Sequence, residues 1–124
     1  MIRIYFNGNE LEPSTIEDFG KYLNRFDEQD SFELWLHEGN EVSICMLRNG
    51  KYAFLMNIRF CGDSGMVSCG DQNVEGTMEY TLSNGQVDEY PISWCIDIEQ
   101  CYKALAYFLV NNGLIPDWII WQST

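Results

Sequence analysis

The hydrophobic positions in the middle of the chain fall in short segments rich in β-branched and aromatic residues, a pattern typical of strands. Turn signals separate these segments at Gly39-Asn40, Asn49-Gly50 and Asn84-Gly85. Asn-Gly favours a tight hairpin because both central positions need a positive φ, which glycine adopts freely and asparagine tolerates. The pattern predicts an antiparallel meander with strands at 31–37, 41–47, 51–60, 66–68, 77–82 and 86–90.

Two segments instead show the spacing of amphipathic helices. Ser14 and Glu17 form a capping-box pattern before the first, and Asp97 and Gln100 form one before the second. Gly113 is placed to end the second helix in a left-handed conformation. The predicted core-facing residues are Ile16, Phe19, Leu23 and Phe26 in the first helix, and Ile98, Cys101, Leu105, Phe108 and Leu109 in the second.

The two ends of the chain add further predicted strands. Residues 2–6 form a β run that ends at Asn7-Gly8. After Pro116, residues 118–121 are continuously apolar and predict a last, largely buried strand with Trp121 in the core. The whole pattern predicts an α+β fold, in which two helices pack on one face of a mainly antiparallel sheet of about six to seven strands.

Length and composition agree with one folded domain over residues 1–124. A chain of this length supports one sizeable core, and 46% hydrophobic with 15% aromatic residues is too apolar for disorder. No apolar run approaches the ~20 residues that cross a bilayer, and the first residues resemble no signal peptide. We therefore expect a cytoplasmic protein without a membrane segment.

The charge balance is strongly acidic. Nineteen Asp and Glu against seven Lys and Arg give a net charge of −12. This charge repels nucleic acid and anionic lipid, and it attracts a basic protein. The simpler interpretation is that the charge serves solubility alone.

The acids are unevenly distributed. Between Phe60 and Tyr102 there is no Lys or Arg, although this stretch contains eight of the acids. Large aromatics among carboxylates favour a protein-binding surface, in which the charges steer the partner and the aromatics anchor it. Solvated strand faces and core aromatics are the alternative interpretation. The candidate partner-binding residues are Asp63, Asp71, Glu75, Glu79, Asp88, Glu89, Tyr90 and Trp94.

The sequence contains no candidate catalytic, cofactor or metal site. His37 is the single histidine, and we expect it to be a solvated or hydrogen-bonded turn residue at a strand end. Residues 71–76 resemble the start of a calcium loop, but its twelfth position is Leu82 and no helices flank it. The odd number of cysteines, five, predicts reduced and mostly buried thiols.

The C-terminal half carries a family resemblance. Asn84-Gly85-Gln86 and Tyr90-Pro91 precede a helix opened by residues 97–99, which is followed by Asn112-Gly113-Leu114-Ile115-Pro116 and an apolar run that closes on Trp121. In this order and spacing, roughly residues 60–121 resemble the first-numbered immunity-protein family (Imm) of bacterial polymorphic toxin systems. Ile115 departs from the pattern, because members often carry Arg or another polar residue there.

The resemblance implies a cytosolic antidote that binds a cognate toxin domain, often a nuclease or nucleic-acid deaminase, and blocks its active site or substrate groove. The signature residues Gly113, Pro116 and Trp121 would then explain the fold and not the inhibition. Two other functions remain open from the sequence: a small adaptor or regulator of another basic protein, and an enzyme with an unrecognised carboxylate site.

Overall fold

A seven-stranded antiparallel sheet forms the centre of the protein in a computed structural model, which describes residues 2–12 and 15–124. Within these residues the strand order is β2-β1-β3-β4-β5-β6-β9. The strands are β1 (Ile2–Phe6), β2 (Asn9–Leu11), β3 (Ser31–Glu38), β4 (Val42–Asn49), β5 (Tyr52–Ile58), β6 (Met66–Ser68) and β9 (Trp121–Ser123). Every neighbouring pair is antiparallel.

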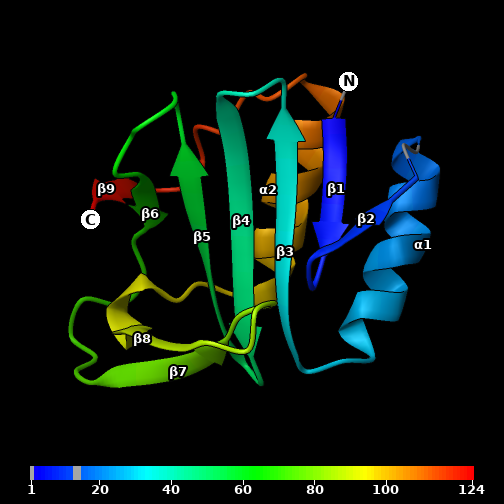
Figure 1. Cartoon of the computed structure of the whole chain (residues 1–124). Helices are drawn as coiled ribbons and strands as arrows, with labels where there is room; N and C mark the ends of the chain where they lie inside the picture. The colour runs from blue at the N-terminus through cyan, green and yellow to red at the C-terminus, as the bar shows by residue number, and fades with distance from the viewer. Residues whose placement is uncertain (1, 13–14) are drawn as a thin grey trace.

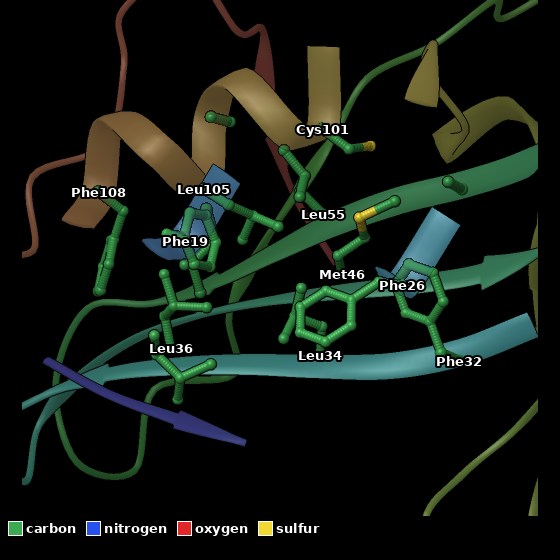
Figure 2. Close-up of a cluster of buried hydrophobic side chains, with 14 of the residues drawn as sticks. Phe19, Phe26, Phe32, Leu34, Leu36, Met46, Leu55, Cys101, Leu105 and Phe108 are labelled. Carbon is green, nitrogen blue, oxygen red and sulfur yellow. The ribbon is translucent and has the colours of Figure 1, made fainter. Parts of the chain in front are cut away.

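The two predicted helices, α1 (Ile16–Asp27) and α2 (Ile98–Val110), both contribute to the core on one face of this sheet. Figure 1 shows α2 behind the central strands. In Figure 2, Phe19 and Phe26 of α1 and Leu105 and Phe108 of α2 lie among side chains of β3, β4 and β5. The predicted α+β fold, with two helices on a mainly antiparallel sheet, is confirmed.

The helix starts differ from the predicted capping boxes. Ser14 lies outside the described residues, and Thr15 is the N-cap of α1, where its Oγ1 accepts a hydrogen bond from the Asp18 N–H at 3.2 Å. Asp97 is the N-cap residue of α2, but its side chain makes no capping hydrogen bond, so the predicted pair with Gln100 is wrong. Ile16 is 45% exposed and does not face the core, because it begins the first turn, beyond the edge of the buried stripe.

The end of α2 confirms the role predicted for Gly113. Its N–H donates to the Phe108 carbonyl at 2.9 Å, and its φ is +92°. A Cβ at this position would lie 2.9 Å from the Glu38 Cβ. Asn112, with φ +53°, shares the left-handed turn. Glycine is therefore required here both by the backbone conformation and by the close approach of β3.

The predicted strand at 118–121 is wrong. Residues 117–118 form a turn, and the strand begins only at Trp121. Ile119 is buried, whereas Trp118 is 44% and Ile120 70% exposed. Trp121 is half-buried and its indole N–H donates to the Pro116 carbonyl at 3.4 Å. It is not fully buried because β9 pairs with β6 at the edge of the sheet.

The predicted meander is correct for the run β3-β4-β5-β6 but not for the next two strands. Strands β7 (Thr77–Thr81) and β8 (Val87–Pro91) form a separate two-stranded sheet, followed by the short helix η1 (Ile92–Trp94). This hairpin packs against β3 and β4 and lies in front of the large sheet in Figure 1, opposite α2. The large sheet therefore has helices on one face and a hairpin over part of the other, which we call the outer face.

The turns also differ in detail from the Asn-Gly prediction. Of the Asn-Gly hairpin turns at 7–8, 49–50 and 84–85, only Asn7-Gly8 has a positive φ at both residues, +49° and +82°, and it adds the unpredicted strand β2 to β1. At 49–50 and 84–85 the glycine alone has a positive φ. Asn49 pairs with Tyr52 as the last residue of β4, so the tight turn there is Gly50-Lys51. A two-residue loop that begins with glycine needs a positive φ at that residue only.

In the part of the chain that the structure describes, no helix combines the length and the hydrophobicity that crossing a membrane requires.

Candidate functional site

The hairpin β7–β8 is attached to the outer face by a second, aromatic cluster. Phe54 is at its centre, with ring-centroid distances of 5.2 Å to Tyr80, 5.1 Å to Tyr90 and 5.5 Å to Trp94. Tyr80 and Phe54 are 1% exposed. The predicted anchors Tyr90 and Trp94 stack on each other at 5.5 Å and are half-buried in this cluster. Both side chains therefore hold the hairpin against the large sheet, and only their exposed edges are free to contact a partner protein.

Glu79 and Glu89 lie directly opposite each other on the exposed face of the hairpin. Glu89 accepts a hydrogen bond from the Thr77 hydroxyl at 3.2 Å. Neither carboxylate forms an ion pair with any residue in the described ranges. Like charges at directly opposed positions destabilise a strand pair. We call Glu79 and Glu89 the hairpin acid pair.

Two other predicted acids, Asp71 and Glu75, are exposed in the loop that leads into β7. Asp71 accepts a hydrogen bond from the Asn73 N–H at 2.9 Å, so its side chain closes a local turn. This turn accounts for the calcium-like composition of residues 71–76. Within residues 2–12 and 15–124, no three His, Cys, Asp or Glu side chains are grouped as metal ligands.

Asp63 and Asp88 already have internal partners. Arg59 donates to both Asp63 oxygens, at 2.8 and 2.9 Å, and these hydrogen bonds lower the pKa of Asp63. Asp88 accepts from Gln86 at 2.6 Å and from the Tyr90 hydroxyl at 3.1 Å. Burial, and then the bond to Asp88, raise the pKa of Tyr90. The six candidate acids thus divide into the partly buried Asp63 and Asp88 and the exposed Asp71, Glu75, Glu79 and Glu89.

The repulsion within the hairpin acid pair leads to a stability prediction. Glu79→Gln or Glu89→Gln should each raise the free energy of unfolding by about 0.2–1 kcal/mol, because either change removes the opposed charges. The double variant should gain little more than either single one, since both act on the same interaction. Urea unfolding at low and high salt measures this. Additive gains, or gains that persist in high salt, would show that the two carboxylates do not repel each other.

A groove of about 450 Å³ lies next to the hairpin on the outer face. Aromatic rings of Tyr5, Trp35 and His37 line it, together with Glu33 and Arg3. His37 is half-buried in β3, with its ring 5.5 Å from both Tyr5 and Trp35, so its predicted place in a turn is wrong. Burial, and then the nearby Arg3 charge, lower the pKa of His37. This groove was not predicted from the sequence, although the alternation of Glu33, Trp35 and His37 along one strand places the three side chains on one face.

All five cysteines are free thiols. Cys45 and Cys101 are buried, and burial raises the pKa of both. Cys69 and Cys95 are partly buried and Cys61 is exposed. The predicted burial is therefore complete at Cys45 and Cys101, partial at Cys69 and Cys95, and wrong at Cys61. The exposed thiol follows the end of β5, in a loop that the core does not cover.

No protein-family model matches the chain, and no curated protein matches its sequence. The resemblance to the immunity family therefore remains a prediction, and the function has to be argued from these surfaces.

Proposed function

We propose that the protein is a cytoplasmic immunity protein, which binds a basic toxin domain and blocks its active site or substrate groove. The observation that carries this proposal is the hairpin acid pair, in which Glu79 and Glu89 oppose each other without a cationic partner in the described chain. Such a pair is unfavourable in the free protein. A partner that places Lys or Arg side chains against both carboxylates would convert the repulsion into attraction.

The net charge of −12 supports the same partner chemistry. A field of this sign raises the association rate of a basic protein and disfavours direct binding of nucleic acid or anionic lipid. Toxin domains that act on nucleic acid need basic grooves, so a nuclease or nucleic-acid deaminase would complement this surface. Inhibition by occlusion requires neither a catalytic residue nor a cofactor of the immunity protein.

An adaptor or regulator that binds another basic protein would use the same surface. The two functions differ in what the partner does when the acidic protein is absent. A toxin stops growth of the cell, whereas the partner of an adaptor does not. An enzyme would instead require carboxylates that converge in a pocket, and the hairpin acid pair lies on an exposed face.

Growth rescue tests the proposal. The toxin domain encoded by the neighbouring gene is expressed in a bacterial host with and without this protein. We expect growth only when the protein is present, and impaired rescue by the double charge reversal Glu79→Lys/Glu89→Lys. The matched control is Glu17→Lys/Glu28→Lys, which makes the same charge change at exposed positions of α1 and its C-cap. Failure of the unaltered protein to restore growth, or equal loss in both variants, would contradict the proposal.

A further inference from the structure

Glu33 is an acidic residue that the structure buries without a partner for its carboxylate. It is 9% exposed and lies on β3. Its backbone is satisfied, because its N–H donates to the Asn7 side chain at 2.9 Å and its carbonyl accepts from the Asn7 N–H at 2.8 Å. The carboxylate itself has no hydrogen bond or ion pair to any residue in the described ranges.

Glu33 is nine-tenths buried as a residue, so the protein replaces most of the water around its side chain. Loss of water around a carboxylate is unfavourable unless hydrogen-bond donors replace it. Glu33 faces the groove on the outer face. The tip of the hairpin closes this end, since Ser83 approaches Gly8 so closely that a Cβ on Gly8 would lie 3.0 Å from the Ser83 Cβ. The groove is therefore the route by which a ligand donor could reach the carboxylate.

Aromatic side chains continue the groove from Glu33. Trp35 is two residues further along β3, so it projects from the same face, and Tyr5 of β1 pairs with it in register. An indole ring beside a carboxylate is a favourable setting for a guanidinium group, which stacks on aromatic faces and donates two parallel hydrogen bonds to a carboxylate.

The opposite end of the groove is cationic. Arg3 pairs in register with His37, four residues from Glu33 and thus about 13 Å along the strand. Its guanidinium donates to the Gly39 carbonyl at 3.0 Å, and it forms no ion pair with Glu33. A cation entering the groove is therefore repelled at the Arg3 end and attracted at the Glu33 end.

We propose that this groove binds an arginine side chain of the partner protein, with the guanidinium bonded to Glu33 and stacked on Trp35. Arginine is favoured over lysine because its cation is planar and less strongly hydrated, which suits a buried carboxylate beside a flat ring. This inference rests on the proposed function only in taking the partner to be a basic protein. The site itself is testable without any partner.

The direct test uses N-acetyl-arginine amide as the probe, with N-acetyl-citrulline amide as its neutral analogue. We expect saturable NMR shifts of the Trp35 indole N–H and of the Tyr5 and His37 resonances with the arginine probe, and none with citrulline. Glu33→Gln keeps the size and polarity of the side chain but removes its charge, and it should weaken binding at least about tenfold. Glu28→Gln, at the exposed C-cap of α1, is the matched control and should bind the probe like the unaltered protein.

A second measurement separates this site from the proposed function. In the complex with the toxin domain, Glu33→Gln should raise the dissociation rate about tenfold and leave the association rate nearly unchanged, because buried charge pairs act mainly on dissociation. Equal shifts with citrulline, or unchanged probe affinity in Glu33→Gln, would overturn the arginine site. Binding of the probe together with failed growth rescue would retain the groove and reject the immunity function.

Discussion

Replacement of Gly70 by alanine is expected to lower the free energy of unfolding by about 3 kcal/mol or more. A Cβ at this position would overlap the Cys95 carbonyl oxygen and lie 2.9 Å from the carbonyl carbon. These atoms are backbone, so no side-chain rotation relieves the overlap. The Gly70 N–H also donates to the Ser93 carbonyl at 2.7 Å, which joins the loop before β7 to the helix η1 after β8.

The matched control for this prediction is Gly20→Ala. Gly20 lies within α1, and a Cβ there would meet no atom within 4 Å. Alanine should stabilise this helix by about 0.5–1 kcal/mol, because glycine loses more backbone freedom on folding. Urea unfolding of both variants measures the two changes. A Gly70→Ala variant as stable as the unaltered protein would show that residues 70 and 95 are not in this close contact.

The second large effect is expected for Phe54→Ala, which should lower the free energy of unfolding by about 3–5 kcal/mol. Phe54 is 1% exposed and touches the rings of Tyr80, Tyr90 and Trp94, which belong to β7, β8 and η1. Its removal would leave a cavity between the large sheet and the hairpin, so near-UV circular dichroism should also change.

Trp121→Ala provides the comparison, because it removes a still larger ring from a half-buried position at the sheet edge. The loss of unfolding free energy should be clearly smaller than for Phe54→Ala. Equal losses would mean that Trp121 belongs to the core, as the apolar run at 118–121 suggested.

The sequence predicted which segments become strands and helices better than it predicted how they assemble. Local alternation and turn residues determine β3, β4 and β5, and pairing between consecutive strands follows from short loops. The hairpin β7–β8 carries equally good strand signals. It forms a separate sheet, held by contacts such as those of Gly70 with Ser93 and Cys95, which join segments more than twenty residues apart. No local pattern encodes such contacts.

For the candidate surface, too, the sequence indicated the segment that carries the acids but not their arrangement in space. The absence of basic residues between 60 and 102 pointed to the segment that contains the hairpin, but not to the register that opposes Glu79 and Glu89. Neutralisation of Asp63 was foreseeable, since Arg59 lies four residues before it. Burial of Glu33 was not, because it depends on the Asn7-Gly8 turn and the hairpin tip meeting over one end of β3.

The central proposal is that the hairpin acid pair binds a basic toxin domain. The association rate of the protein with that domain tests it most directly. The rate is measured for the unaltered protein, for Glu79→Lys/Glu89→Lys and for Glu17→Lys/Glu28→Lys, at low and at high salt. Reversal of the hairpin acid pair should slow association about tenfold at low salt and flatten its salt dependence, because interface charges act on the encounter. The α1 control should change both quantities much less. Equal effects of the two variants, or none from the hairpin pair, would contradict this account.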